Sequence, residues 1–327
     1  DEAGFTVIEE EGAVASAETV DESAEAGADS YLLPHSPVDP LLELEGQTFG
    51  HFKIDNLLGR GQSGLVFRAQ DFKTKQTVSL KVIAADFPAS EAELSRFVAA
   101  VKTASSLHHP ALVTVNAAGK SGHYCWLSRE YLEGESLTRR IRRLNEGGKP
   151  DWKAACRLAL HLATLLDFLH RHKVAHGNIT PRNVLIRASD QMTKLADLML
   201  NRALEGSKLQ KAILPNKLLT ELPYMAPEQT EPHAPLTPLG DIYALGVVLY
   251  ATLTGKPPFT GDTPKAVLCQ MHRGKVVPPS KLQRGIPPLM ETAVLMMMAR
   301  RPEERFQSAP DVLEALESFA EKHDIKV

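Results

Sequence analysis

The sequence has 327 residues, of which 43% are hydrophobic and 24% are charged, and its formal net charge is −3. These values are typical of a soluble globular protein with one large domain or two ordinary ones. No run of about 18 apolar residues occurs, so we predict no membrane span, and we expect the apolar segment 241–253 to be a buried helix.

Cysteine and histidine usage narrows the chemistry further. Cys125, Cys156 and Cys269 are scattered and form no C-x-x-C pair. Such cysteines indicate free thiols in a reducing compartment, so we expect a cytoplasmic protein. The 12 histidines show no metal-ligand spacing, and no structural metal is predicted. We expect no nucleic acid as a partner.

The first part of the chain differs in charge from the rest. Residues 1–52 contain 13 of the 40 acidic residues and none of the 37 Lys and Arg residues. A segment so rich in Ala, Ser, Gly and Glu cannot bury enough apolar surface to fold alone. We therefore predict an acidic, largely disordered tail over residues 1–47, with 1–30 disordered and the more apolar 31–47 able to dock. The tail is either a solvated linker or a segment that lies loosely against the basic remainder.

From residue 49 onward the sequence becomes periodic and rich in strand patterns. The predicted elements are, in order, two strands around a glycine-rich turn (52–71), a strand (76–83), a helix (90–106) and two strands (111–119 and 123–132). Ser90 is the expected N-cap of the helix.

After residue 134 helical periodicity takes over. Helices are predicted over 136–145, 152–172, 240–254, 263–273, 287–299 and 309–322. A strand-rich part followed by a helix-rich part predicts an α+β architecture in two segregated lobes. We expect this folded region to span 48–327, divided into 48–133 and 134–327.

A glycine pattern, G-x-G-x-x-G-x-V, runs from Gly59 through Gly61 and Gly64 to Val66. Glycines of this kind let a backbone approach phosphates closely, with amide N–H groups directed toward them. By itself the pattern is equally compatible with an ordinary hairpin. A dinucleotide-binding fold would need the glycines to open a helix, whereas the residues that follow continue as a strand.

Further motifs follow in a fixed order. They are Lys81 in VSLKVI, the segment HGNITPRNVLI (176–186) with Asn183, then Asp197, Ala226-Pro227-Glu228, Asp241 in DIYALGVVLY, and Arg305. Together with the glycine turn they resemble the eukaryotic-type (Hanks-type) bacterial serine/threonine protein kinases over residues 48–320. The resemblance implies a bilobal protein-kinase-like fold, with a small N-terminal β-sheet lobe carrying one helix and a larger, mainly helical C-terminal lobe.

The resemblance also implies cofactors and roles. ATP and Mg²⁺ are the implied cofactors, and a protein is the implied partner or substrate. The implied nucleotide-contacting residues are Gly59, Gly61 and Gly64 over the phosphates, Lys81 beside them, Val66 and Ser79 above the adenine, Leu185 beneath it, and Glu130 and Leu132 at the hinge backbone. Asn183 and Asp197 are the implied Mg²⁺ ligands, since their oxygens suit this cation. The implied supports of the fold are the Glu228–Arg305 pair and Asp241 below the catalytic loop.

The catalytic loop departs from the family pattern. Asn178 stands where an Asp accepts the proton of the substrate hydroxyl, and Thr180 where a Lys supports the moving phosphate. Gly177 replaces the Arg that reaches a phosphorylated activation loop. An amide cannot take up a proton near neutral pH. Asn178 and Thr180 are therefore degenerate catalytic positions.

Four further departures lie outside this loop. Ala100 stands at the position of the helix Glu that pairs with Lys81, Arg129 at the gatekeeper position, Leu198-Met199 in place of Phe-Gly after Asp197, and Glu221 in place of Thr in the substrate-docking loop. Glu91 or Glu93 is the alternative partner for Lys81. Met199 removes the conformational freedom that Gly supplies.

These observations lead to three functional hypotheses. The first is a pseudokinase with a regulatory or scaffold role that still binds MgATP weakly. The second is an active, divergent kinase that transfers the ATP γ-phosphate to protein Ser or Thr. The third is a structural interaction domain whose nucleotide site is closed by Arg129. A general base contributes about 10²–10⁴-fold to a rate, so the loss of the Asp does not by itself decide between the first two.

Overall fold

The structure divides into two compact units. The computed structural model describes residues 7–10, 39–61, 63–84, 87–231 and 234–326. The first unit consists of the described residues up to Ser105 together with 114–131 and 202–214, and the second consists of 106–113, 132–201 and the described residues from Pro215 onward. The expected α+β architecture, with a sheet-rich and a helix-rich part, is confirmed. Segments 106–113 and 202–214 each belong to the unit opposite to the one expected.

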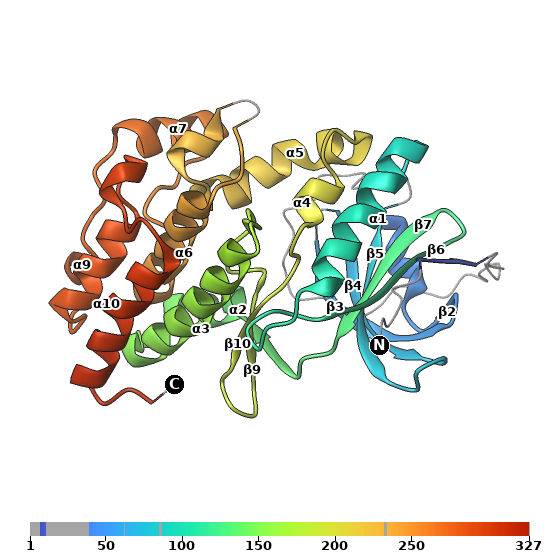
Figure 1. Cartoon of the computed structure of the whole chain (residues 1–327), viewed down its shortest axis with the longest axis horizontal. Helices are drawn as coiled ribbons and strands as arrows, with labels where there is room; N and C mark the ends of the chain where they lie inside the picture. The colour runs from blue at the N-terminus through green and yellow to red at the C-terminus, as the bar shows by residue number, and fades with distance from the viewer. Residues whose placement is uncertain (1–6, 11–38, 62, 85–86, 232–233, 327) are drawn as a thin grey trace. The chain divides into compact units, whose positions relative to one another are not determined.

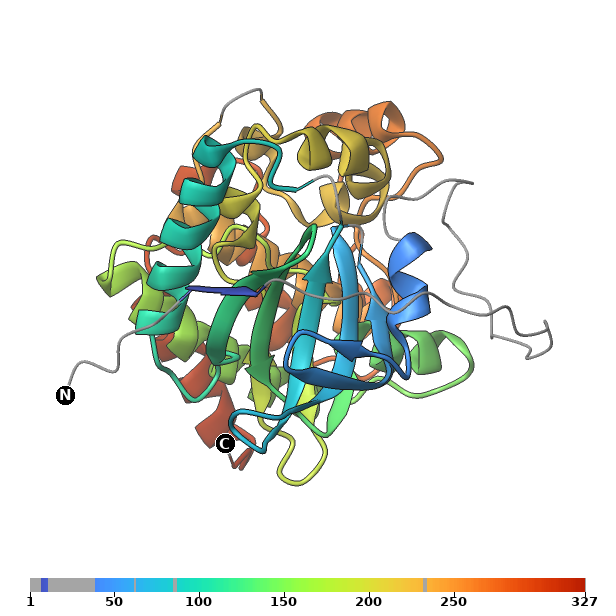
Figure 2. The same cartoon turned by 90° about the vertical axis from the view of Figure 1, so that its right-hand side faces the viewer.

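A seven-stranded sheet forms the first unit (Figures 1 and 2). Its strands are β1 (Val7–Glu10), β2 (Thr48–Phe49), β3 (Phe52–Arg60), β4 (Gly64–Asp71), β5 (Thr77–Ile83), β6 (Val115–Ser121) and β7 (Tyr124–Glu130), in the order β1-β6-β7-β5-β4-β3-β2. Neighbouring strands are antiparallel except β1 and β6, which are parallel. One long helix, α1 (Glu91–Ser106), belongs with the sheet. The predicted strands and helix are confirmed, although β6 starts at Val115 rather than at Ala111.

Buried and partly exposed residues alternate along the strands, and the buried ones form the core of this unit. Leu65, Phe67 and Ala69 on β4 are fully buried, whereas the residues between them are partly exposed. Phe52 and Trp126 meet edge to face beneath the sheet, with ring centroids 4.9 Å apart. Because side chains alternate between the two faces of a strand, one face of β4 packs into this core and the other remains available for a site.

Two described segments of the acidic tail are folded. β1 pairs with the edge of β6 that faces away from β7, over residues 118–121. A 3-10 helix, η1 (Asp39–Leu44), packs on β4 and buries the side chain of Leu41 completely. The folded chain therefore begins before residue 48, because the apolar docking segment supplies part of the core. The remainder of the segment 1–30, predicted to be disordered, lies outside the described residues.

Helices dominate the second unit. Its elements are β8 (Gly134–Ser136), α2 (Leu137–Asn145), α3 (Trp152–Arg171), β9 (Val184–Arg187), β10 (Thr193–Leu195), η2 (Leu222–Tyr224), η3 (Pro227–Thr230), α6 (Pro238–Thr254), α7 (Pro264–Arg273), α8 (Pro279–Leu282), α9 (Pro288–Met297), η4 (Pro302–Glu304) and α10 (Ala309–Lys322). The three strands form a small sheet in the order β10-β9-β8. All six helices predicted here are confirmed, with small shifts at their ends.

The helix α6 is the centre of this unit. It packs against α2, α3, α8 and α9, and nearly all of its side chains are buried. Thr237 caps its start by accepting the Gly240 N–H at 3.1 Å, and Gly255 ends it with a φ of 86°. This segment is the buried helix expected from its composition. Among the described residues no helix is long and apolar enough to cross a membrane.

Two helices, α4 (Leu200–Ala203) and α5 (Lys208–Glu221), were not expected from the sequence. Pro215 lies inside α5, and a proline in a helix interior removes a backbone hydrogen bond and argues against a helix. The segment that precedes it, KLQKAIL, consists of good helix formers. These favourable residues are the only local signal for α5.

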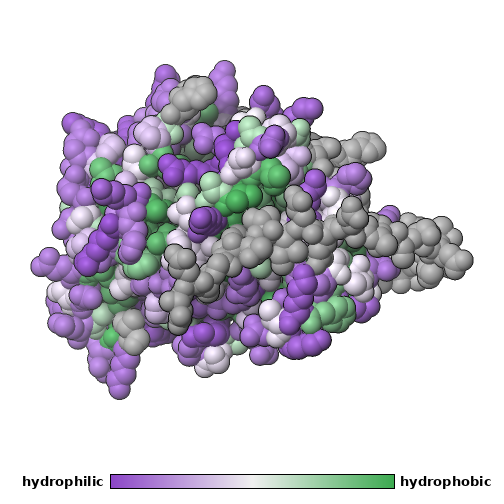
Figure 3. All heavy atoms as spheres, turned by 45° about the vertical axis from the view of Figure 1, so that its right-hand side comes forward, coloured by the Kyte–Doolittle hydropathy of each residue, from purple (hydrophilic) through white to green (hydrophobic). Residues whose placement is uncertain are grey.

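Hydrophilic side chains predominate on the face of the molecule shown in Figure 3. Large hydrophobic side chains that remain exposed, such as Phe72 at 47% and Leu289 at 53%, come from separate elements. Most of the apolar content is therefore used in the two cores.

Candidate active site

One face of the first unit's sheet gathers residues that were assigned to nucleotide contacts. In the ladders, Lys81 lies opposite Val66 on β4 and opposite Leu127 on β7, and Ser79 lies opposite Arg129. Ser79 and Lys81 are two residues apart on β5, so their side chains leave the same face of the sheet. The strand register therefore brings the nucleotide-contacting residues Val66, Ser79 and Lys81 together with Arg129, the expected gatekeeper, although they come from three different strands.

This face carries two buried cations. Lys81 is 4% exposed and Arg129 is 7% exposed. The guanidinium of Arg129 reaches the hydroxyl of Ser79, with Nη2 and Oγ 3.5 Å apart. Two cations on one face create a positive potential there, which attracts anions. Arg129 lies beside the position assigned to the adenine contact.

The glycine turn joins β3 and β4 as predicted. The Gly61 N–H donates to the Gly64 carbonyl at 2.9 Å, which closes the turn. A Cβ on Gly64 would lie 2.0 Å from the carbonyl oxygen of Val82, so β4 can approach β5 only with glycine there. A Cβ on Gly59 would meet no described atom within 4 Å. Gly64 is thus required by the sheet itself, whereas the packing of the described residues does not require Gly59.

The residue at the end of β7 is held by the segment that precedes β6. The Glu130 N–H donates to the carbonyl of Thr114 at 3.0 Å, and the Glu130 carboxylate accepts the Thr114 N–H at 2.7 Å. This double contact fixes the start of the expected hinge. Sequence reasoning did not find it, because the partner lies 16 residues earlier.

Helix α1 offers no carboxylate at the position expected to pair with Lys81. Ala100 occupies it and is 6% exposed. Glu93, one of the two suggested substitutes, accepts the Ala89 N–H at 2.8 Å, and its own N–H donates to Ser90 Oγ at 3.3 Å. The arrangement differs from a standard capping box only in that Glu93 accepts the N–H of the residue before the N-cap. Ser90 is therefore confirmed as the N-cap, and Glu93 serves the start of the helix.

In the second unit, Asp241 organises the catalytic loop. Its side chain is buried at the start of α6 and accepts the N–H groups of His176 and Gly177, both at 2.8 Å. The Nε2 atom of His170 lies 3.0 Å from the same carboxylate. The bracing role assigned to Asp241 is confirmed. The contact with His170 was missed, because the two residues lie 71 positions apart in the sequence.

The loop residue at the catalytic position is itself well ordered by hydrogen bonds. The Asn178 N–H donates to His176 Nδ1 at 3.2 Å, and the Asn178 carbonyl accepts the Asn183 amide at 2.9 Å. Burial lowers the pKa of His176, while the Asp241 and Asp197 carboxylates act in the opposite direction. A neutral ring agrees with an Nδ1 that accepts a hydrogen bond. The loop is thus built in full, but residue 178 supplies an amide instead of a carboxylate.

Gly177 adopts a conformation that suits glycine. Its φ is +66°, and a Cβ there would lie 2.4 Å from a methyl group of Leu236. The arginine of the family pattern could occupy this position only if Leu236 moved and the left-handed backbone were strained. The departure at Gly177 is therefore matched by its surroundings.

The two implied Mg²⁺ ligands lie close together along the backbone. The Asn183 N–H donates to the Thr180 carbonyl at 3.0 Å, and the Asn183 carbonyl accepts the Ala196 N–H at 2.8 Å, one residue before Asp197. Because the Asn183 Nδ2 atom donates to Asn178, its Oδ1 atom is left as a cation ligand. A carboxylate and an amide oxygen suit Mg²⁺. The donor set therefore fits the implied cation.

Met199 takes up the conformation that the family pattern gives to glycine. Its φ is 65°, and its side chain is 8% exposed. A left-handed residue with a Cβ costs roughly 1–2 kcal/mol. The strain is offset by the burial of the thioether side chain. The predicted loss of conformational freedom at this position stays a prediction.

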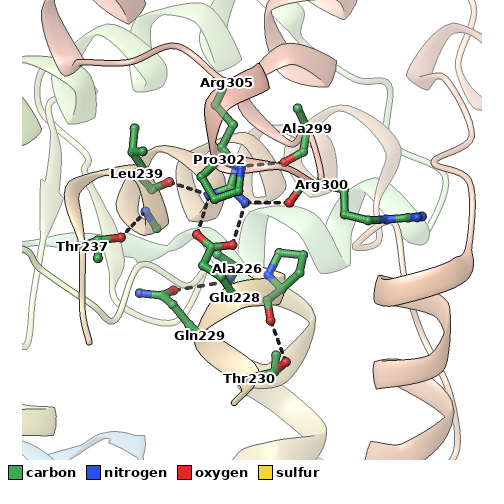
Figure 4. A network of polar contacts seen from close by, with 12 residues as sticks. Ala226, Glu228, Gln229, Thr230, Thr237, Leu239, Ala299, Arg300, Pro302 and Arg305 are labelled. Atoms are coloured by element: carbon green, nitrogen blue, oxygen red, sulfur yellow. Dashed lines mark hydrogen bonds and ion pairs between the residues drawn. The ribbon is translucent and has the colours of Figure 1, made fainter. Parts of the chain in front are cut away.

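The expected ion pair between Glu228 and Arg305 is present (Figure 4). Arg305 Nη1 and Nη2 each donate to Glu228 at 2.7 Å. The remaining N–H groups donate to the carbonyls of Ala299, Leu239 and Arg300. A guanidinium has five N–H donors, so the cation is fully satisfied.

The assigned residues are divided between the two units. Gly59, Gly61, Gly64, Val66, Ser79, Lys81 and Glu130 belong to the first unit, and Leu132, Asn178, Thr180, Asn183, Leu185 and Asp197 belong to the second. Leu185 lies on β9 opposite Ser136 and Lys194, and Thr180 is buried within the loop. The roles assigned to these residues stay predictions.

Comparison with known proteins agrees with this picture. Residues 52–315 match the family model of the protein kinase domain. The chain is 29% identical over 265 residues to the serine/threonine-protein kinase PknB of Mycobacterium tuberculosis, which covers 80% of this chain and 41% of PknB. It is 30% identical over 267 residues to PknH of Mycobacterium bovis, which covers 82% of this chain and 44% of PknH.

A solved structure shows the same fold. The crystal structure of the Mycobacterium tuberculosis PknI kinase domain, determined on a mutant, superposes with a TM-score of 0.64 at 21% identity, covering 84% of this chain and 98% of that one. The chain spans about two fifths of the length of its curated relatives, 41% of PknB for example. Since the family model matches most of its length, the chain belongs to the protein kinase family, with the eukaryotic-type serine/threonine kinases of bacteria as its relatives.

Proposed function

We propose that this kinase domain is a pseudokinase, a regulatory or scaffold module that binds MgATP weakly and transfers phosphate very slowly or not at all. The observation that carries the proposal is Asn178. It sits in a loop that Asp241 and His176 hold in order, yet it has no group that can accept a proton near neutral pH. The geometry of the loop is preserved without its base.

Weak nucleotide binding is supported in each unit separately. The first unit has a face with two buried cations, Lys81 and Arg129, next to the glycine turn. The second has the oxygen ligands of Asn183 and Asp197. Bound Mg²⁺ would neutralise phosphate charge. Lys81 would attract the polyphosphate, and Asn183 and Asp197 would hold the cation.

Very slow transfer follows from several losses together. A missing general base alone removes about 10²–10⁴-fold in rate. Thr180 has no charge to support a moving phosphate, and Ala100 has no carboxylate to position Lys81. Phosphoryl transfer depends mainly on positioning and charge neutralisation, so these losses act on the same step.

A thermal-shift titration with ATP, with and without Mg²⁺, tests the binding half of the proposal. A ligand at 100 times its dissociation constant stabilises a fold by about 2.7 kcal/mol. We expect a Mg²⁺-dependent rise in Tm at millimolar ATP that Asp197→Ala abolishes. No rise at all would favour the alternative of a structural domain without nucleotide binding. Arg129→Ala then reports whether that arginine closes the site.

A radiolabel transfer assay tests the catalytic half, with Lys81→Ala as the background control. We expect a signal at or near background. Turnover near the 1–100 s⁻¹ of ordinary kinases would instead establish the alternative of an active, divergent serine/threonine kinase. Asn178→Asp alone should not restore full activity, because Thr180 and Ala100 remain.

The partner and the place of action are part of the same proposal. The relatives are named serine/threonine-protein kinases, so we infer that this domain acts on or with a protein. Its three cysteines are free thiols, which suits a reducing compartment such as the cytoplasm.

A further inference from the structure

A cavity in the second unit that is lined by both charged and apolar residues plays no part in the proposed function. Its volume is about 340 Å³. The second half of α2, residues 148–151 and the first half of α3 line it, together with Gln191 and Thr252. Figure 1 shows α2 and α3, the two green helices whose residues line it. A cavity of this size admits a small ligand or a short segment of a peptide.

Cationic side chains dominate the lining. Arg140, Arg143, Lys149 and Arg157 all reach it, and Asp151 is the one acidic residue among the described residues that line it. Asp151 is already used, because its Oδ1 atom caps α3 by accepting the Ala154 N–H at 2.9 Å. The start of α3, where the helix dipole is positive, therefore faces the same space as the four cations.

Two of the cations, Arg140 and Arg143, are held in place by Glu135, which does not line the cavity. Glu135 binds the guanidinium of Arg143 through both carboxylate oxygens, with one contact at 2.6 Å, and lies 3.3 Å from Arg140 Nε. The second arm of Arg140 donates to Gln191 Oε1 at 2.7 Å. The arginine side chains lower the pKa of the Glu135 carboxyl. An arginine fixed in this way loses little conformational entropy when a ligand arrives.

The other two cations have no such anchor. Among the described residues, no carboxylate forms an ion pair with Lys149 or Arg157. Four positive charges thus meet the capping carboxylate of Asp151 in the lining, and the carboxylates of Glu135 and Glu146 act on Arg143. The lining itself, with four cations and one carboxylate, carries an excess of positive charge that suits an anion.

We propose that this cavity binds a phosphate ester as a dianion. A phosphate monoester carries about −1.5 to −2 charges at neutral pH and three acceptor oxygens. Arg157 and Lys149 supply the donors for these oxygens, because Arg140 and Arg143 already bind Glu135 and Gln191. Ile141, Leu144 and Leu158 form an apolar floor, which suits the organic part of the ester. The source is either a small phosphorylated molecule or a phosphorylated serine or threonine in a polypeptide.

Calorimetric titration of the full 327-residue chain tests the proposal. The probes are pyrophosphate, a phosphoserine peptide and the same peptide with aspartate in place of phosphoserine. The titrations are carried out on Lys81→Ala protein, so that binding at the nucleotide site does not contribute. A failure of the proposed function therefore leaves this test unaffected.

The pocket variant is Lys149→Gln/Arg157→Gln, and its matched control is Arg139→Gln/Arg142→Gln. The control also removes two positive charges, but its residues lie on α2 and do not line the cavity. We expect the pocket variant to weaken phosphate binding at least about tenfold and the control to change it less than about threefold. If the double variant unfolds, the single substitution Lys149→Glu replaces it, because Lys149 is exposed and its replacement should not disturb the fold. Its expected effect on phosphate binding is also a loss.

The outcomes separate the two sources. Binding of pyrophosphate and phosphopeptide alike shows that the phosphate group is sufficient and supports a small-molecule source. Binding of the phosphopeptide alone supports a phosphoprotein. The proposal is overturned if no phosphate probe binds at millimolar concentration, if both double variants lose binding equally, or if the aspartate peptide binds as tightly as the phosphopeptide.

Discussion

Arg305 holds the carboxylate of Glu228 with two hydrogen bonds of 2.7 Å each, and its other three N–H groups donate to backbone carbonyls. The pair joins η3 to the segment between η4 and α10, so it holds together two parts of the helical unit that lie far apart in the sequence. Asp241 is satisfied in the same way below the catalytic loop. These two supports of the kinase fold are thus present in a chain that has Asn178 where the family pattern has the catalytic Asp.

The first prediction concerns this pair. Replacing Glu228 with alanine leaves the fully buried side chain of Arg305 without its counterion. The loss of one partner of a buried pair costs about 3–5 kcal/mol, and the 31% exposure of Glu228 reduces the expected cost to about 2–4 kcal/mol. Urea unfolding measures the change in the free energy of unfolding.

A surface pair provides the control. Arg301 and Glu303 also form an ion pair, but their side chains are 66% and 59% exposed. Glu303→Ala should leave the urea midpoint unchanged, since exposed pairs contribute little. Equal effects of the two substitutions would contradict the structural role given to Glu228.

The second prediction concerns the backbone at Met199. Both Met199→Ala and Met199→Gly lose the packing of a buried side chain and should destabilise the protein. Because φ is positive at this residue, the glycine variant should be more stable than the alanine variant by about 1 kcal/mol. At Leu198, which is not among the positive-φ residues, the order should reverse, with alanine more stable by about 0.4–1 kcal/mol. Equilibrium unfolding of the four variants measures both differences.

The third prediction separates two glycines of one turn. In Gly64→Ala the new Cβ would meet the Val82 carbonyl at 2.0 Å, so β4 must shift away from β5. We expect a loss of about 1–3 kcal/mol or more. Gly59→Ala has room and should change stability by no more than about 0.5 kcal/mol. If Gly59→Ala weakens MgATP binding in the thermal-shift assay, that loss reports on the ligand and not on the fold.

The fourth prediction follows from the buried ring of His176. Its pKa is lowered from 6.5 by burial, so in mildly acidic solution the unfolded chain takes up a proton that the folded chain does not. The free energy of unfolding should therefore fall as the pH drops below 6.5, by at most about 1.4 kcal/mol per pH unit for this group. His109 and His161 are shifted in the same direction, also by burial. Urea unfolding across this range should give a shallower slope for His176→Asn, and an unchanged slope would show that other groups carry the pH dependence.

Much of the architecture could be predicted from local patterns. The glycine hairpin, the alternating strand around Lys81, the capped helix after Ser90 and the apolar helix around Asp241 all carry short-range signals. The helix α5 could not be predicted, because Pro215 lies inside it and argues against a helix. The docking of Leu41 depends on a partner strand that the tail sequence does not specify.

The site shows the same limit. The residue types at positions 178, 180 and 197 are visible in the sequence, and so is the missing carboxylate. What could not be foreseen is how neighbours respond to the departures. Leu236 occupies the space beside Gly177, and Glu93 is engaged as a helix cap. Both facts depend on contacts between residues that no local pattern relates.

The strand β1 has a consequence for how the chain can be shortened. Every strand at the border of a sheet presents unpaired N–H and C=O groups on which another chain can add. Here four residues of the N-terminal segment cover that border along β6. A version that starts after Glu10 would expose the backbone of residues 118–121, and such a border invites intermolecular strand pairing and aggregation. Where it is retained, β1 forms the border itself, but it is only four residues long and ends in Glu9 and Glu10, and short, charged border strands resist pairing with another chain.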